Sequence, residues 1–165
     1  MIVLAPAHLK AIIDAAEAAY PDECCGLLVG RTAPAGDVQV ERVEASRNVV
    51  DGDAARRFEV DPQLRFDLMR QLAGGETRLV GHYHSHPGHA AQPSAHDLSM
   101  AWEPELVWLI TAVHDGQAVL TTAHVLDDDG HRFRPIDLRT DDWQADPVRH
   151  ATAAETNDIP SGENG

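Results

Sequence analysis

Residues 81–97 read GHYHSHPGHAAQPSAHD, and the rest of the chain is organised around them. His84 and His86 stand two residues apart, and residues i and i+2 of a β-strand project from the same face. If residues 78–86 are extended, the two imidazoles point the same way and can share one metal ion. Pro87 then ends the regular strand and turns the chain.

The end of this stretch, Ser94 to Asp97, has the pattern of a loop that enters a helix. The turn can bring Asp97 back as a third ligand. Two histidines and one carboxylate, with water in the fourth position, form a catalytic zinc site, whereas structural zinc favours four protein ligands rich in cysteine. The alternative is a capping box, in which Ser94 accepts from the backbone and Asp97 reaches back. Taken together, the motifs favour a hydrolytic metal site.

Three further histidines complicate this site. His82 lies on the same face of the predicted strand as His84 and His86, so it could be an alternative ligand or a partner that orients one. His89 and His96 are expected at the rim, where they could touch substrate. Single histidines in strands are more often core or surface residues, so these roles stay open.

Composition limits the classes of protein. The chain has 165 residues and a mass of 17.9 kDa, which suits one domain with a sizeable core. It has no apolar run long enough to span a membrane and no secretion signal at its start, so we expect a cytoplasmic protein with no membrane partner. The formal net charge of −14 argues against binding nucleic acid and favours a basic partner surface.

The two cysteines, Cys24 and Cys25, are adjacent. This excludes a long-range disulfide framework and fits a reducing compartment. Two small buried side chains beside a strand are a simpler explanation than a redox pair. Their influence on the neighbouring Glu23 stays open.

The order of elements predicts an α/β sandwich with a mixed sheet. Apolar spacing and turn residues separate the elements. We expect residues 1–140 to form one domain and residues 141–165 an acidic, loosely ordered tail, the alternative being one extra helix around Trp143. Strands are expected at residues 1–4, 27–30, 38–41, 57–60, 77–86, 106–113, 118–125 and 131–138, and helices at residues 8–20, 62–72 and 94–102.

The residues then match a known pattern. Glu23 before Cys-Gly-Leu-Leu-Val-Gly, followed far downstream by His84-Ser85-His86-Pro87, Ser94 and Asp97, resembles the JAMM motif of MPN+ zinc metalloproteases, in particular the compact bacterial members. The resemblance covers roughly residues 1–138. It implies an MPN (JAMM) domain, in which helices sandwich a mixed, largely antiparallel sheet. It also implies hydrolysis of amide or isopeptide bonds, typically after the C-terminal Gly-Gly of ubiquitin or ubiquitin-like proteins.

The resemblance assigns a role to each motif residue. His84, His86 and Asp97 become ligands of one Zn²⁺ per chain, with water as the fourth ligand. Ser94 assists the oxyanion while starting the helix that carries Asp97, and Glu23 is the general base. The assignment of Glu23 rests on the resemblance alone, because a glutamate at a helix-to-strand junction is otherwise an ordinary solvated residue.

The leading hypothesis is a zinc metallopeptidase that acts on the C-terminal tail of a ubiquitin-like or sulfur-carrier protein. Short connections between the strands argue against selectivity for polyubiquitin chains. A non-catalytic MPN scaffold is the alternative, and it is disfavoured because scaffolds of that kind typically lack metal ligands. An unrelated zinc deaminase is disfavoured because the Cys-x-x-Cys ligands are absent. The oligomeric state stays open.

Overall fold

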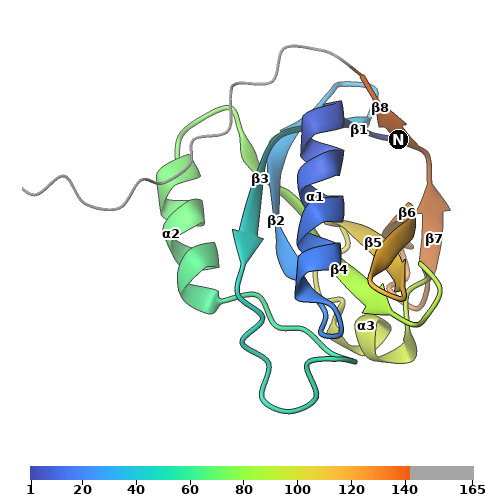
Figure 1. The fold of residues 1–165 in the computed structure, drawn as a ribbon. Coiled ribbons are helices and arrows are strands. Elements are labelled where there is room, and N and C mark those ends of the chain that lie inside the picture. Colours follow the sequence, from blue (N-terminus) through green and yellow to red (C-terminus); the bar gives the residue numbers. More distant parts are fainter. Residues whose placement is uncertain (142–165) are drawn as a thin grey trace, which may run out of the picture.

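The computed structural model describes residues 1–141, which form one eight-stranded mixed sheet with three helices (Figure 1). The strands are β1 (Ile2–Leu4), β2 (Cys25–Thr32), β3 (Val38–Ser46), β4 (Arg78–Pro87), β5 (Val107–His114), β6 (Gln117–Leu126), β7 (Phe133–Ile136) and β8 (Leu138–Thr140). The helices are α1 (Pro6–Ala19), α2 (Pro62–Leu72) and α3 (Ala95–Met100).

The strand order is β7-β6-β5-β4-β2-β3-β1-β8. Neighbours pair antiparallel except for β4 with β5, β1 with β3 and β1 with β8, which are parallel. The sheet is therefore mixed and largely antiparallel, as predicted. Strand β4 lies at its centre, between β2 and β5, and is buried along most of its length.

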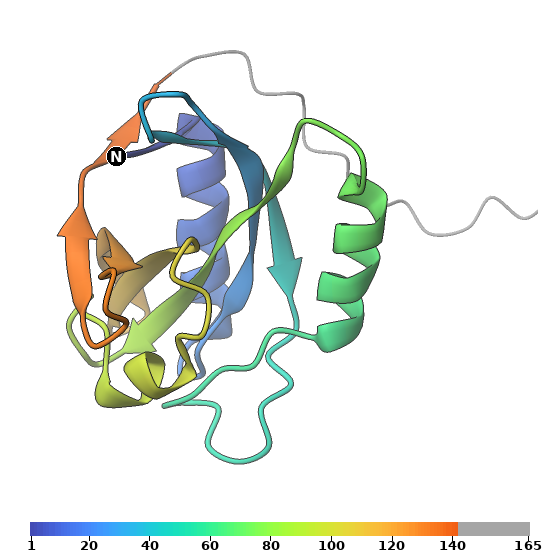
Figure 2. The same cartoon turned by 180° about the vertical axis from the view of Figure 1, so that it is seen from behind.

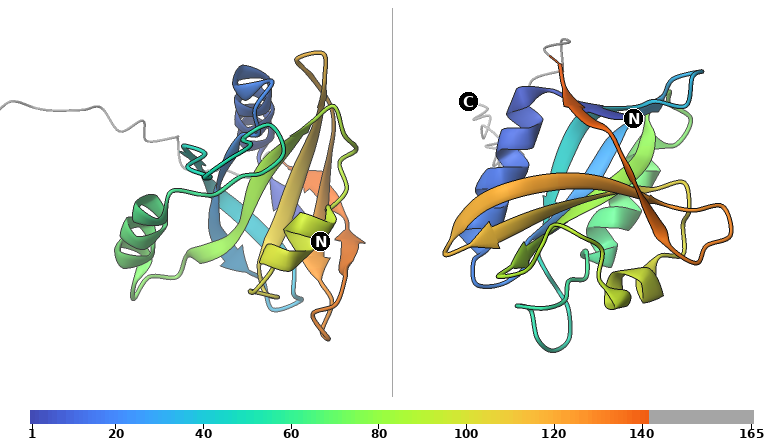
Figure 3. Two further views of the ribbon diagram at one scale, coloured as in Figure 1. Left: turned by 90° about the horizontal axis from the view of Figure 1, so that it is seen from below. Right: turned by 90° about the vertical axis from the view of Figure 1, so that its right-hand side faces the viewer.

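Helices cover both faces of β2. Ile12 and Ala16 of α1 pack in the larger core cluster, which contains Leu28. Leu27 belongs to a second cluster with Leu68 of α2. Adjacent strand residues point to opposite faces, so α1 and α2 lie on opposite sides of this part of the sheet (Figures 2 and 3). The predicted α/β sandwich is confirmed.

The expected strand at residues 57–60 is wrong. Only Val60 forms an isolated bridge, with Asn48. The Asn48 side chain takes the place of a partner strand: its amide donates to the carbonyl of Arg57 at 3.0 Å and its oxygen accepts from the backbone of Glu59 at 3.1 Å. This side chain and a backbone hydrogen bond from Val49 to the carbonyl of Glu59, at 3.0 Å, hold the segment in place.

The single strand expected at residues 131–138 is also wrong. It divides at Asp137 into β7, which pairs with β6, and β8, which pairs with β1 at the other edge of the sheet. The carbonyl of Asp137 accepts from the backbone of Ile2 at 2.8 Å. The sheet curls so far that one residue connects its two edges (Figure 3, right).

The tail predicted at residues 141–165 lies outside the described residues, apart from Asp141. Within residues 1–141, none of the helices has the length and apolar character needed to cross a membrane.

Candidate metal centre

Strand β4 brings two imidazoles together. His84 and His86 are 0% and 6% exposed, and their Nε2 atoms lie 3.0 Å apart. They are held from both sides, because β4 hydrogen-bonds to β2 and β5. The prediction that the two rings share a face of the strand is confirmed.

Asp97 reaches the same point from α3. The chain turns at Gly88, where φ is +73°, and returns so that Asp97 Oδ1 lies 3.5 Å from His84 Nε2 and Oδ2 lies 3.4 Å from His86 Nε2. All three side chains are buried, and one ligand atom from each lies within 4.8 Å of the others. This group, called the metal centre below, has the spacing to hold a metal ion.

The donor atoms of the group suit a cation. His86 Nδ1 donates to the carbonyl of Ala90 at 2.9 Å, so Nε2 is the nitrogen that faces Asp97 and would bind a metal. Burial lowers the pKa of His86, but its hydrogen bonds to Asp97 and Ala90 raise it overall, so a bound cation would replace the proton on Nε2. Burial lowers the pKa of His84 and keeps that ring neutral. Burial alone would raise the pKa of Asp97, but hydrogen bonds from His84 and His86 hold it well below its usual range. Two imidazoles and one carboxylate are a ligand set that fits zinc.

The loop before α3 is anchored to β6. Ala91 is buried, and its carbonyl accepts a hydrogen bond from Thr122 Oγ1 at 2.5 Å. The same hydroxyl lies 3.0 Å from His124 Nε2. Because the next residue back, Ala90, orients His86, this anchor stabilises the position of a metal-centre ring.

Ser94 is an exposed N-cap residue of α3. Its Oγ accepts from the backbone of Asp97 at 3.0 Å and lies 2.7 Å from Asp97 Oδ2, while the Ser94 backbone donates to the same carboxylate at 2.6 Å. The capping box, which was the alternative interpretation of Ser94 and Asp97, is therefore present. The Ser94 hydroxyl hydrogen is directed to Asp97 in this arrangement.

Glu23 lies just before β2 and is 5% exposed. Cys25 pairs with His84 across the antiparallel strands, and this register brings Glu23 to the His86 end of the metal centre. Burial raises the pKa of Glu23 to about 7, an effect that His86 opposes and Asp97 reinforces. A buried carboxyl that titrates near neutrality suits proton transfer.

The adjacent cysteines are free and buried. Burial raises the pKa of Cys24 to about 11 and that of Cys25 to about 12, so both thiols stay protonated at neutral pH. The backbone of Cys24 donates to Ser85 Oγ at 2.8 Å and its carbonyl accepts from the Ser85 backbone at 3.2 Å. These bonds tie the segment carrying Glu23 to β4.

Phe58 is a site residue to which the sequence assigned no role. Its ring stacks on His84, with centroids 4.3 Å apart and planes 18° apart. No spacing in the sequence connects residue 58 to residue 84. The only available signal was that residues 57–62, Arg-Phe-Glu-Val-Asp-Pro, belong to the stretch covered by the family resemblance.

The other histidines take different positions. The ring centroid of His82 lies 6.3 Å from that of His84, and His82 is outside the group that could hold a metal. Burial lowers the pKa of His82 to about 3, so this ring is neutral. His96 lines a cavity beside the metal centre, and His89 is exposed on the loop.

Comparisons of sequence identify relatives. Residues 5–126 match the family described as prokaryotic homologs of the JAB domain. A desampylase of Haloferax volcanii is 33% identical over 120 residues, which cover 72% of this chain and 78% of the relative. A CysO-cysteine peptidase of Mycobacterium tuberculosis is 28% identical over 115 residues, or 70% of this chain and 75% of the relative.

Solved structures share the fold. A protein from Desulfitobacterium hafniense has a TM-score of 0.73 at 28% identity and covers 92% of this chain and 97% of its own. One from Salinibacter ruber scores 0.66 at 30% identity, with coverages of 91% and 97%. A JAB1/MPN domain protein from Archaeoglobus fulgidus scores 0.51 at 20% identity, with coverages of 85% and 98%. The chain thus has a JAB1/MPN fold and belongs to the family of prokaryotic homologs of the JAB domain.

Proposed function

We propose that the protein is a zinc-dependent metallopeptidase that hydrolyses an amide or isopeptide bond after the C-terminal Gly-Gly of a ubiquitin-like or sulfur-carrier protein. The observation that carries the proposal is the buried convergence of His84, His86 and Asp97 next to a buried Glu23. The relatives named desampylase and CysO-cysteine peptidase support this class of substrate.

His84, His86 and Asp97 are the proposed ligands of one zinc ion. When bound, zinc would polarise the scissile carbonyl and lower the pKa of a water molecule from about 15.7 to about 7. The protein supplies a fixed carboxylate and two fixed rings, one oriented by the carbonyl of Ala90. Phe58 and the surrounding strands exclude solvent from the rings.

Glu23 is the proposed general base. It accepts the proton of the attacking water while the water oxygen bonds to the carbonyl carbon. It then returns the proton to the amine nitrogen as the C–N bond breaks. Such proton transfer contributes about 10²–10⁴ in rate. The raised pKa supports this role, because a group that titrates near neutral pH can both take and give a proton.

Ser94 is the proposed donor to the oxyanion. Its exposure at the start of α3 supports access to substrate. The role requires the hydroxyl hydrogen to leave Asp97 and turn to the substrate oxygen. Removing one such donor costs about 10²–10³ in rate.

The test uses a ubiquitin-like domain that ends in Gly-Gly and is fused through an amide bond to a reporter protein. The zinc-loaded wild type is expected to release a domain whose mass ends at the second glycine. A matched fusion ending in Ala-Ala should resist cleavage. Cleavage of neither fusion at full zinc occupancy would contradict the proposal and favour the non-catalytic scaffold.

A further inference from the structure

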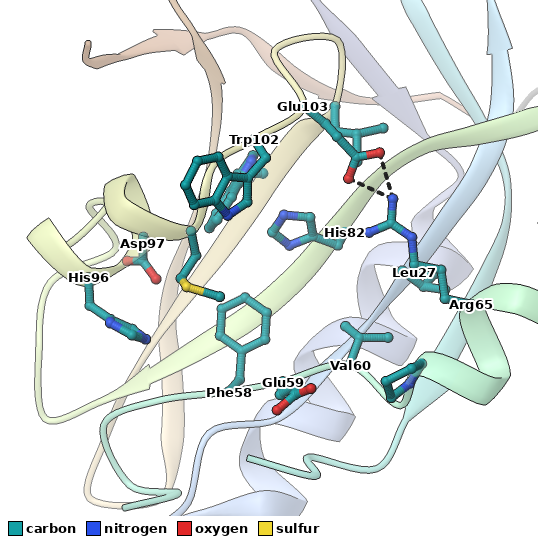
Figure 4. A pocket seen from close by; sticks show the side chains of 14 residues that line it. Leu27, Phe58, Glu59, Val60, Arg65, His82, His96, Asp97, Trp102 and Glu103 are labelled. Atoms are coloured by element: carbon teal, nitrogen blue, oxygen red, sulfur yellow. Dashed lines mark hydrogen bonds and ion pairs between the residues drawn. The ribbon is translucent and has the colours of Figure 1, made fainter. Parts of the chain in front are cut away.

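A cavity of about 260 Å³ opens beside the metal centre (Figure 4). We call it the side cavity. Its wall includes Asp97 and His96, so it adjoins the metal centre directly. The rest of the wall is mostly apolar and comes from β2, β5, the segment before α2, and α3 with the residues that follow it. It includes Leu27, Phe58, Val60, Met100, Trp102 and Trp108.

His82 stands in this apolar wall with one unpaired nitrogen, Nδ1. The residue is 9% exposed, and its buried Nδ1 has no hydrogen-bond partner. Its ring is fixed edge-on against Trp108, with centroids 4.0 Å apart. Leaving a buried polar atom unpaired costs free energy that an apolar residue here would avoid. An unpaired, fixed imidazole facing a cavity therefore points to a ligand.

The position of the side cavity relative to Glu23 shows which part of the substrate the cavity faces. This step rests on the proposed function. Glu23 lies at the His86 end of the metal centre, whereas His82 lies beyond His84 at the other end. Because Glu23 returns its proton to the leaving amine, the amine lies near Glu23. The acyl part of the substrate then runs toward His82.

The distances fit a tail that ends in Gly-Gly. Two extended residues span about 7 Å, and the ring centroids of His82 and His84 are 6.3 Å apart. The two glycines can pass Phe58 without a side chain of their own. The next residue upstream brings its side chain to the side cavity.

We propose that the side cavity binds the side chain that precedes Gly-Gly, and that it selects a bulky apolar group ending in a hydrogen-bonding atom, as in tyrosine. The apolar wall receives the ring, and the hydroxyl pairs with His82. A hydroxyl both donates and accepts, so it suits either tautomer of the imidazole. Arg65 contacts both carboxylate oxygens of Glu103 at 2.6 Å, so this pair adds no net charge. Glu59 and Asp97 also line the cavity, and the arginine peptide in the test measures whether they favour a basic side chain over tyrosine.

The test measures binding of product peptides, acetyl-Ala-Xaa-Gly-Gly with a free carboxylate, by titration calorimetry. Xaa is tyrosine, phenylalanine, alanine or arginine. The tyrosine peptide is expected to bind about tenfold more tightly than the phenylalanine peptide, the worth of one hydrogen bond. The alanine and arginine peptides should bind more weakly than the phenylalanine peptide. The ranking should be the same in zinc-loaded and zinc-free protein.

The key variant is His82→Phe, which keeps the ring and removes the nitrogens. It should abolish the difference between tyrosine and phenylalanine, and its Tm should not fall, because no hydrogen bond within the protein is lost. A merely structural His82 would lower the Tm instead. His114→Phe, an exposed histidine at the end of β5, is the matched control and should keep the wild-type ranking.

A second variant tests the wall independently of His82. Trp102 is 78% exposed at the cavity, so Trp102→Ala should fold normally and weaken the tyrosine and phenylalanine peptides equally. Equal binding of all four peptides, binding of none, or an unchanged ranking in His82→Phe would overturn the subsite.

Failure of the subsite and failure of the proposed function give different results. Cleavage of the Gly-Gly fusion with no preference at Xaa would keep the peptidase and refute the subsite. Binding that depends on Xaa and on His82, without cleavage of any fusion, would support the subsite and contradict the peptidase.

Discussion

At the scale of single residues, the balance between burial and hydrogen bonding sets the charge on each group of the site. Glu23 and Asp97 are both buried carboxyls, yet burial raises the pKa of Glu23 to about 7 while hydrogen bonds keep the pKa of Asp97 far lower. The difference arises because His84 and His86 face Asp97 directly. One carboxylate is therefore suited to hold a cation and the other to move a proton.

The first prediction concerns pH and Glu23. A base acts when deprotonated, so kcat/KM should rise with pH through the pKa of Glu23. That pKa is about 7 without a cation, and a bound cation lowers it toward the ordinary value of 4.5, so the acid limb should lie between these values. Zinc content must be measured at each pH, because protonated imidazoles release metal.

Two variants test whether Glu23 causes the acid limb of the pH profile. Glu23→Gln should keep its zinc, lose about 10²–10⁴ in kcat and lose the acid limb. Glu76→Gln, at an exposed glutamate, is the control and should match the wild type. An unchanged rate in zinc-loaded Glu23→Gln would remove Glu23 from the mechanism.

At the scale of elements, α3 and the loop before it hold the site together. Helix α3 spans only Ala95–Met100, so it depends on its cap and on tertiary contacts more than on its own length. Ser94 caps it, and Thr122 of β6 anchors the preceding loop at Ala91. The position of Asp97 follows from both contacts.

Ser94→Ala should affect stability and rate together. Loss of the cap should lower the free energy of unfolding by about 1 kcal/mol, and loss of the oxyanion donor should lower kcat by about 10²–10³. Chemical denaturation and steady-state kinetics measure the two effects. Ser99→Ala removes an exposed hydroxyl from the same helix and is the control. A loss of stability with unchanged kcat would show that Ser94 caps the helix and is not an oxyanion donor.

Thr122→Val should weaken metal binding from a distance. The isosteric change leaves the buried carbonyl of Ala91 without its hydroxyl donor, at a cost of about 1–3 kcal/mol. Because the loop orients His86, we expect zinc affinity to fall about tenfold or more. Thr121→Val is the matched control: it removes the contact with Thr111 on the neighbouring strand and should spare zinc affinity. Equal zinc affinity in all three proteins would refute the anchor.

Local patterns predicted the elements better than their partners. The i, i+2 rule paired His84 with His86, and Ser94 was correctly expected to begin a helix, because both are short-range properties. The strand expected around Phe58 failed because a side chain, Asn48, satisfies that backbone. Nothing local in the sequence indicates such a contact.

At the scale of the whole molecule, the curled sheet brings distant segments to one point. Glu23 meets His86 only because β2 lies beside β4, and the division of the last predicted strand at Asp137 reflects the same curvature. Local sequence patterns cannot predict a contact between residues about sixty positions apart, so Glu23 was identified by resemblance to a family. The core clusters pack without the metal-centre residues.

Zinc removal should therefore leave the fold intact. Chelation should lower the Tm without changing the far-ultraviolet circular dichroism at 25 °C, and zinc at about 100 times its dissociation constant should add about 2.7 kcal/mol to the free energy of unfolding. Loss of secondary structure on chelation would show that the metal is needed for folding.

The most direct test is zinc content by elemental analysis of the wild type and His84→Ala, purified in parallel, with His114→Ala as the control. The proposed metal centre predicts about one zinc per chain in the wild type and control, as a mononuclear catalytic site requires, and a large loss in His84→Ala. Full zinc occupancy in His84→Ala would contradict the assignment of His84, His86 and Asp97 as the ligands.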